Sequence, residues 1–273
     1  MKSFTTTIIL VLPLLASCSS NDPIPVATRE HWMQRAIDAL SELTSTPCPF
    51  EAFGAAIVNH TDVTNSEHGE LICLGVNSIM KLGNPTLHGE TAAINNCSGI
   101  LTSDPYNLSG AEALRAFRDL SIYTTAEACP MCATAIRWAG FKDYTYGTSG
   151  KTLKSQGWPQ LSLSSSELFE HTSSLPTETR IVPDVLADET DPLFRWQYDS
   201  SGKCPAGCRR ARVMDTENGE HGRTCIPGDP SEEESLAGEV AEDVAKGTAK
   251  GMAGLWSVLF GLFKVAAPVG DEL

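Results

Sequence analysis

The chain has 273 residues, of which 41% are apolar and 20% are charged, a composition typical of one globular domain of ordinary size with appendages. Its net charge is −14, and residues 21–200 contain 11 basic and 22 acidic residues, a difference of −11. Because proteins bind nucleic-acid backbones through Lys and Arg, this charge makes long polyanions poor ligands.

The first 20 residues have the layout of a secretory signal peptide, with an apolar run from Ile8 to Ala16 followed by small residues. This run is too short to span a bilayer. We predict cleavage and secretion, with lipid attachment at Cys18 of the lipoprotein-like box Leu15-Ala16-Ser17-Cys18 as one alternative. Retention in the secretory pathway is another, because the chain ends in Gly270-Asp271-Glu272-Leu273. Acceptor sites for N-glycosylation begin at Asn59, Asn96 and Asn107.

The nine cysteines also fit an oxidising compartment. If Cys18 leaves with the signal peptide and two others bind a metal, six remain, which suggests up to three disulfides. The sequence leaves their pairing open. The six are Cys48, Cys73, Cys97, Cys204, Cys208 and Cys225.

The apolar spacing from Thr28 to Leu43 predicts a packing helix that ends before the Pro47-Cys48-Pro49 cluster. Two runs typical of strands follow, Ala52 to Val58 and Leu71 to Val76, with polar residues between them. We expect a hairpin with a long loop.

Helical spacing returns from His88 to Leu101, and a further helix is expected over Ala111 to Arg118. The next elements are a strand at Leu120 to Thr125, a helix at Cys129 to Ala139 and a strand at Tyr144 to Gly147. A strand, a helix and a strand in this order predict a parallel crossover.

The rest of the chain divides into three parts. Within the predicted domain, residues 28–200, we expect a last strand at Arg180 to Val182 and a closing helix at Asp188 to Tyr198. Residues 201–235 are typical of a poorly ordered acidic linker that contains cysteines. Residues 236–273 favour a helical tail, whose apolar part from Gly251 to Val269 is read as a packing helix, an amphipathic or membrane-contacting segment, or a processed tail.

The pattern His-x-Glu occurs twice and is weak by itself. His68-Gly69-Glu70 falls in the polar loop before a strand, and we interpret it as a solvated loop. His88-Gly89-Glu90 opens an apolar-faced helix directly after Asn84-Pro85-Thr86, so its side chains leave a defined turn. The second copy is therefore the candidate for chemistry.

The second motif is Cys129-Pro130-Met131-Cys132, between a strand and a helix. A spacing of three on a helix places both sulfurs on one face, and the start of a helix favours thiolates. Alone, the motif is compatible with a redox pair, a structural disulfide or metal ligands.

The two motifs together predict one catalytic Zn²⁺ per chain. His88, Cys129 and Cys132 would supply three ligands and leave a fourth position for water, which distinguishes a catalytic zinc from a closed structural one. Glu90 would be the nearby carboxylate that is not a ligand and that moves protons as base and then as acid.

Residues 84–90 and 127–132 resemble the two core motifs of the cytidine deaminase-like superfamily of zinc deaminases, and are most similar to those of guanine deaminases and tRNA-type adenosine deaminases. The segments 49–55 and 185–189 extend the resemblance, so it covers about residues 28–200. It implies an α/β fold, a three-layer α/β/α sandwich around a five-stranded mixed sheet.

The resemblance also suggests a substrate pocket. Asn77 matches the family's substrate-binding Asn, although a turn residue that caps a strand is its ordinary interpretation. Gly89 and Ala128 replace a more usual Ala and Pro and would act through the backbone. Phe53 and Trp138 would stack on a base, although core packing is at least as common for such residues.

We therefore predict a secreted hydrolase that deaminates a small nucleobase or nucleoside, of guanine, guanosine, adenosine or cytidine type, and releases ammonia. One alternative is a nucleic-acid deaminase, which the tRNA-type resemblance favours and the charge opposes. Another is a secreted binding protein that keeps the fold without catalysis. The sequence leaves open whether identical chains form a homo-oligomer.

Overall fold

The computed structural model describes residues 24–61, 66–199, 201–211 and 224–228. The predicted signal peptide, the Cys18 box and the tail from residue 236 lie outside these residues. Among the described residues, no helix combines the length and the hydropathy that a membrane span requires.

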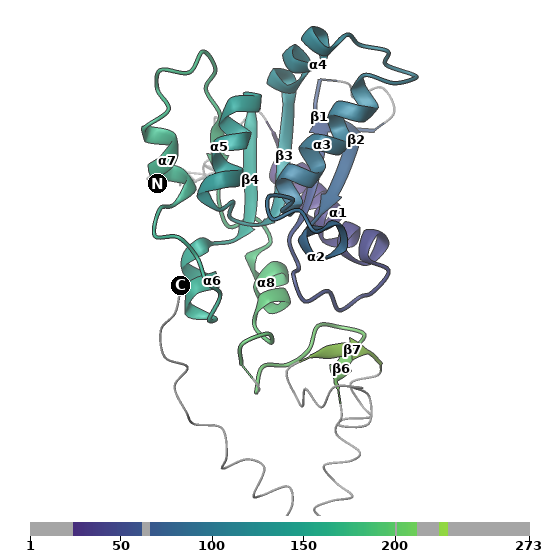
Figure 1. Cartoon of the computed structure of the whole chain (residues 1–273), viewed down its shortest axis with the longest axis vertical. Helices are drawn as coiled ribbons and strands as arrows, with labels where there is room; N and C mark the ends of the chain where they lie inside the picture. The colour runs from purple at the N-terminus through teal and green to yellow at the C-terminus, as the bar shows by residue number, and fades with distance from the viewer. Residues whose placement is uncertain (1–23, 62–65, 200, 212–223, 229–273) are drawn as a thin grey trace, which may run out of the picture.

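A five-stranded mixed sheet forms the centre of the domain. Its strands are β1 (Gly54–Asn59), β2 (Glu70–Val76), β3 (Leu120–Ala126), β4 (Asp143–Thr148) and β5 (Arg180–Val182), in the spatial order β2-β1-β3-β4-β5. β1 pairs antiparallel with β2 and β3, whereas β4 pairs parallel with β3 and β5. The predicted hairpin, parallel crossover and last strand are confirmed (Figure 1).

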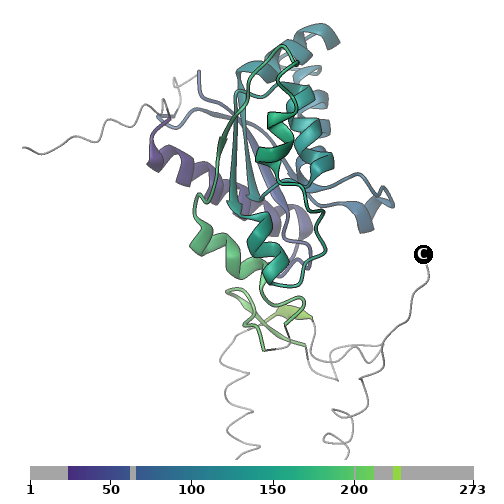
Figure 2. The ribbon, with the colours of Figure 1, turned by 90° about the vertical axis from the view of Figure 1, so that its left-hand side faces the viewer.

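Helices cover both faces of this sheet, as Figure 2 shows edge-on. On β1, Ala55 and Ile57 face the core under α3 (Gly89–Leu101) and α5 (Pro130–Ala139). Their neighbours Ala56 and Val58 pack with Trp32 and Ala36 of α1 (Val26–Thr44) on the opposite face. The alternation follows from the period of two in a strand, and it gives the predicted three-layer α/β/α sandwich.

The predicted helices from residues 28, 88, 111 and 129 are present within one to two residues of their expected starts. Three shorter helices on the connections were not expected, namely α2 (Ile79–Leu82), α6 (Gly150–Ser155) and α7 (Ser165–Glu170). The helix expected over Ala111 to Arg118 is α4 (Gly110–Ala116), which the 3₁₀ turn η1 (Phe117–Asp119) follows directly.

The predicted closing helix at Asp188 to Tyr198 is wrong in its extent. Only Ala187–Thr190 forms an α-helix, α8, and Asp191–Phe194 forms a 3₁₀ turn, η2. Pro192 explains the break, because it has no backbone N–H to donate to the carbonyl oxygen four residues earlier.

The residues after η2 form a C-terminal segment, by which we mean residues 195–199, 201–211 and 224–228. It contains a two-stranded antiparallel sheet of β6 (Cys208–Arg210) and β7 (Cys225–Pro227), where the sequence predicted only a loop. The six predicted cysteines form three disulfides, Cys48–Cys208, Cys73–Cys97 and Cys204–Cys225. The first joins the C-terminal segment to the domain, because Cys48 precedes β1.

Candidate metal centre and substrate cavity

Sheet register brings the candidate motifs to one edge. Gly54 at the start of β1 pairs with Val76 at the end of β2, and Ala55 pairs with Thr124 near the end of β3. The segments outside these pairs therefore meet beyond the same edge of the sheet. These segments carry Phe53, Asn77 and the residues from Glu127 onward.

Two helices begin at this edge, and each begins with a candidate ligand. His88 is the N-cap residue of α3 and Cys129 that of α5, and neither side chain is used as a cap. Pro130 in the first turn fits the start of α5, because its fixed φ suits a helix and its missing N–H has no partner there anyway. His88 Nδ1 and Cys129 Sγ lie 3.6 Å apart.

Cys132 lies three residues into α5 and is buried. The ligand atoms of His88, Cys129 and Cys132 all lie within 4.8 Å of one another, the only such group of metal-ligating side chains among the residues that the structure describes. One nitrogen and two sulfurs at this separation fit a zinc ion, which binds such atoms at about 2.0 to 2.3 Å in a tetrahedron. The two sulfurs are free thiols, so the disulfide interpretation of this motif is wrong.

The thiols differ in acidity. Hydrogen bonds from the Cys132 thiol and from His88 lower the pKa of Cys129 to about 4, against the effect of burial. The hydrogen bond with Cys129 and burial raise the pKa of Cys132 well above its usual range. The pair thus favours one thiolate and one thiol, and binding a divalent cation through both sulfurs would release the remaining proton.

Glu90 lies beside the three ligands in the first turn of α3, with only 5% of its surface exposed. Burial and the nearby charge of Cys129 raise the pKa of its carboxyl to about 7. A carboxyl group with a pKa near neutrality can accept and return a proton under ordinary conditions. Glu90 is therefore suited to proton transfer.

A cavity of about 230 Å³, which we call the base cavity, opens in front of Glu90 and His88. Its walls include four aromatic side chains. The ring centroids of Phe53 and Tyr198 each lie 5.2 Å from that of Trp158, and the ring centroid of Phe50 lies 5.9 Å from it. Such a small cavity, with aromatic walls and a few polar groups, suits a flat heteroaromatic ring.

Two of the predicted pocket residues line the base cavity. Phe53 forms part of the aromatic wall. Asn77 also faces the cavity, although its side-chain oxygen accepts a hydrogen bond from the backbone N–H of Ile79 at 3.0 Å. Asn77 is thus both the turn residue of its ordinary interpretation and a cavity residue, with its NH₂ group left to donate.

The structure places the other three predicted pocket residues outside this lining. Trp138 lies on α5 with 73% of its surface exposed, a placement that does not support stacking on a base. The backbone N–H of Ala128 donates to the Tyr144 hydroxyl at 2.6 Å. Gly89 is buried, and a Cβ atom there would lie 2.4 Å from the Phe53 carbonyl oxygen, which explains why Gly replaces the more usual Ala.

Sequence reasoning missed several residues of the cavity wall. Glu51 lies in the segment used for the resemblance, yet nothing in its pattern marked it as a cavity residue. Trp158 and Tyr198 come from connections after β4 and after η2. Only tertiary packing brings these residues together. The segment that carries Tyr198 is held against the segment that carries Phe50 by a hydrogen bond from Gln197 to the Phe50 carbonyl oxygen, at 2.8 Å, and by the disulfide Cys48–Cys208.

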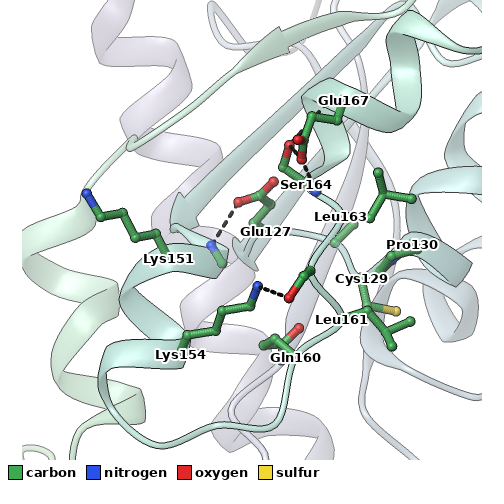
Figure 3. A pocket seen from close by; sticks show the side chains of 13 residues that line it. Glu127, Cys129, Pro130, Lys151, Lys154, Gln160, Leu161, Leu163, Ser164 and Glu167 are labelled. Carbon is green, nitrogen blue, oxygen red and sulfur yellow. Dashed lines mark hydrogen bonds between the residues drawn. The ribbon is translucent and has the colours of Figure 1, made fainter.

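A neighbouring cavity of about 270 Å³ shares Glu127, Cys129 and Gln160 with the base cavity (Figure 3). Glu127 acts here as a clamp. Its carboxylate accepts from the backbone N–H of Gly150 and of Ser165, both at 2.8 Å, at the starts of α6 and α7. These bonds hold the loop that carries Trp158 and Gln160 between the two helices.

The other His-x-Glu pair is away from the site, as predicted, but its side chains are not free. His68 stacks on His31 with ring centroids 4.3 Å apart, and its Nδ1 lies 3.1 Å from the Thr28 hydroxyl. Glu70 accepts a hydrogen bond from the Tyr106 hydroxyl at 2.9 Å. The interpretation as a solvated loop is wrong in this respect, because packing against α1 and the loop after α3 fixes both residues.

Residues 26–148 match the family model of the cytidine and deoxycytidylate deaminase zinc-binding region. This part of the chain is therefore similar to that zinc-binding region. The match contains both motifs of the metal centre and ends with β4. The matched region thus contains His88, Cys129 and Cys132, which the structure gathers into one group.

Two relatives resemble this chain in sequence. A guanine deaminase of Bacillus subtilis is 28% identical over 154 residues, which cover 55% of this chain and 83% of that protein. A chloroplastic tRNA(adenine(34)) deaminase of Arabidopsis thaliana is 33% identical over 96 residues, 34% of this chain and 6% of that protein. Among solved structures, a guanine deaminase of Nitrosomonas europaea is 17% identical with a TM-score of 0.44, over 71% of this chain and 97% of that one.

Proposed function

We propose that the protein is a zinc-dependent hydrolase that deaminates a nucleobase or nucleoside and releases ammonia. One observation carries this proposal: three ligand atoms lie within 4.8 Å of one another, beside a buried Glu90 that faces the same small cavity. The family match and the deaminase relatives support the reaction class.

His88, Cys129 and Cys132 would hold the zinc ion. A Zn²⁺ bound there supplies Lewis-acid activation of water for attack on the amino-bearing ring carbon. Glu90 takes a proton from this water and delivers it to the adjacent ring nitrogen. The second proton of the water goes by the same carboxylate to the amino group, which leaves as ammonia, so the amine is exchanged for a carbonyl oxygen.

The other cavity residues orient the substrate and exclude solvent. The rings of Phe53, Trp158 and Tyr198 would enclose the planar base, and the free NH₂ group of Asn77 would donate to a ring nitrogen or carbonyl acceptor. Burial of Glu90 keeps bulk water from competing for its proton. These assignments give the aromatic wall and Asn77 a role in substrate binding.

Glu90→Gln tests the proposal directly. The amide keeps the shape of the side chain but cannot transfer the proton, so we expect a loss of roughly 10²- to 10⁴-fold in kcat with zinc content unchanged. The assay follows ammonia from guanine, guanosine, adenosine and cytidine, with metal content measured on the same sample. Absence of ammonia from every compound with zinc-loaded wild-type protein would sink the proposal and favour a non-catalytic binding protein.

A tRNA-type deaminase is the second candidate, because one relative is a tRNA(adenine(34)) deaminase at 33% identity. The charge balance of residues 21–200, with 11 basic and 22 acidic residues, opposes it. Tight binding of RNA that weakens steeply with added salt would support this candidate over a small substrate.

We further propose that the protein is secreted, with lipid attachment or retention as the alternatives. Three disulfides support an oxidising compartment, because such bonds are rare in the cytosol. Mass spectrometry of secreted protein would show cleavage after the apolar run and glycans at Asn59, Asn96 or Asn107. Full-length protein confined to the cytosol, with reduced cysteines, would contradict this proposal.

A further inference from the structure

The base cavity continues into a groove that the deaminase reaction does not by itself explain. This groove has a volume of about 640 Å³ and shares Phe50, Glu51 and Asn77 with the base cavity. The two spaces therefore meet at the wall beside His88. A free base would fill the smaller space and leave the larger one to solvent.

The groove offers hydroxyl groups with unused hydrogen-bonding capacity. The Ser78 hydroxyl donates to the Val76 carbonyl oxygen at 3.0 Å, so its lone pairs remain to accept. The Thr46 hydroxyl oxygen accepts from the backbone N–H of Cys48 at 3.2 Å, so its own hydrogen remains to donate. Both residues line the groove and are half-buried. An acceptor and a donor together match sugar hydroxyl groups, which both donate and accept.

Apolar side chains form another part of the wall. Leu43, Val76 and Met80 line the groove together with these hydroxyls, and Met80 has 86% of its surface exposed. Sugars bind to surfaces of this mixed kind, because their C–H faces are apolar and their edges are polar. The charged groups of the lining are Glu51 and Lys81, so the groove carries no excess of positive charge that would favour a polyanion.

The neighbouring cavity beside Cys129 suits a sugar less well. Its two carboxylates are already used, because Glu127 accepts from Gly150 and Ser165, and Glu167 accepts from the Ser164 hydroxyl at 2.7 Å. Lys154 donates to the Ser162 hydroxyl at 3.3 Å, as Figure 3 shows. The carboxylates of this cavity are therefore already used by the protein itself, whereas the hydroxyl groups of the groove have capacity left to bind.

We propose that the groove is a sugar-binding subsite and that the substrate is a nucleoside, whose base enters the base cavity and whose sugar lies against Ser78, Thr46 and Met80. The inference rests on the proposed deaminase function and narrows its substrate. Asn77 stands at the junction, where the bond between base and sugar would pass.

The test compares ammonia release from three bases and their nucleosides, namely guanine and guanosine, adenine and adenosine, and cytosine and cytidine. Wild-type protein is expected to favour one nucleoside over its base by at least about tenfold in kcat/KM, the value of one or two additional hydrogen bonds. Met80→Trp places a larger side chain in the groove and should lower kcat/KM for that nucleoside by about tenfold, with little change for its base.

Leu82→Trp is the matched control, because Leu82 lies on the same short helix, is 64% exposed and does not line the groove. Leu82→Trp should leave kcat/KM unchanged for both the nucleoside and its base. Ser78→Ala provides a second variant, with a rise in KM for the nucleoside of about three- to tenfold and none for the base.

The outcomes separate the two proposals. Ammonia from free bases only, or an equal effect of Met80→Trp on base and nucleoside, overturns the sugar subsite and leaves the deaminase function intact. Ammonia from none of the six compounds and from no RNA overturns the deaminase function itself. Deamination of RNA with every free nucleoside inert overturns the subsite in favour of a nucleic-acid substrate.

Discussion

The metal centre and the C-terminal segment are held in place by different physical means. Around the metal centre, α3 and α5 pack on the sheet through a buried core that includes Ala93, Cys97, Ala133 and Ile136. The C-terminal segment instead gathers around Trp196, whose buried neighbours are Cys48, Cys208 and Cys225. Hydrophobic burial fixes the first region, with the disulfide Cys73–Cys97 between β2 and α3 added to it, whereas two disulfides and one aromatic side chain fix the second.

This difference shows that the metal ligands and the cavity wall have different structural requirements. Ligands must be held within a few tenths of an ångström, and both helix starts are rigid because they follow from sheet register and core packing. The cavity wall requires less precision, so a cross-linked segment can supply Tyr198 without a large core of its own. The chemistry thus depends on the sheet, and substrate enclosure depends on the disulfides.

The largest effect is expected at the metal centre. Cys129→Ala removes one of three ligands, so bound zinc and deaminase activity should both fall below detection while the fold persists on its buried core. Metal analysis and ammonia release on one purified sample check this. Met131→Ala is the control, because Met131 lies between the two cysteines and is partly exposed at 36%. Equal losses in both variants would contradict the assignment of ligands.

The next prediction breaks the cross-link between the two regions. Removing Cys48–Cys208 as Cys48→Ser with Cys208→Ser should lower the free energy of unfolding by about 2 to 5 kcal/mol. Because the wall that carries Tyr198 loosens, KM should rise more than kcat falls. Urea unfolding and steady-state kinetics measure the two effects.

Cys204→Ser with Cys225→Ser is the control for that cross-link, because this pair removes a disulfide within the C-terminal segment alone. This control variant should have a KM closer to that of the wild-type protein. A larger rise in KM in this control than in the Cys48 and Cys208 variant would contradict the role given to the cross-link.

A third prediction concerns the packing of α3 behind the site. Gly89→Ala should lower the free energy of unfolding by about 1 to 3 kcal/mol, because its Cβ would lie 2.4 Å from the Phe53 carbonyl oxygen. Gly99→Ala on the same helix meets no atom within 4 Å and should instead stabilise by about 0.5 to 1 kcal/mol. Thermal unfolding compares the two variants. A change of the same sign in the free energy of unfolding of both would contradict the close approach of a Cβ atom at residue 89 to the Phe53 carbonyl oxygen.

The smallest effect is expected at Trp138. With 73% of its surface exposed and no place in the cavity lining, Trp138→Ala should change stability by less than about 0.5 kcal/mol and leave activity unaltered. Trp158→Ala is the comparison, because Trp158 is only 7% exposed and lines the base cavity. Trp158→Ala should lower the free energy of unfolding by about 3 to 5 kcal/mol and raise KM. A loss of activity in Trp138→Ala would restore its predicted role in stacking.

Much of the domain follows from local sequence. Period-two and helical patterns predicted β1 to β5 and the helices α1, α3, α4 and α5, because each element buries one face against the same core. His88, Glu90, Cys129 and Cys132 were also readable, since the start of each helix fixes their relative positions within a motif. The pattern after Asp188 misled, because Pro192 ends α8 within an otherwise helical spacing.

The sequence by itself determined the five strands of the central sheet, four of the helices, the two motifs and the number of cysteines available for disulfides. Only the tertiary structure decided which cysteines pair, which aromatic residues enclose the base cavity and that a hydroxyl-lined groove extends it. These features join segments as distant as Phe50 and Tyr198. Their proximity depends on how the whole chain packs, and no local periodicity encodes such a contact.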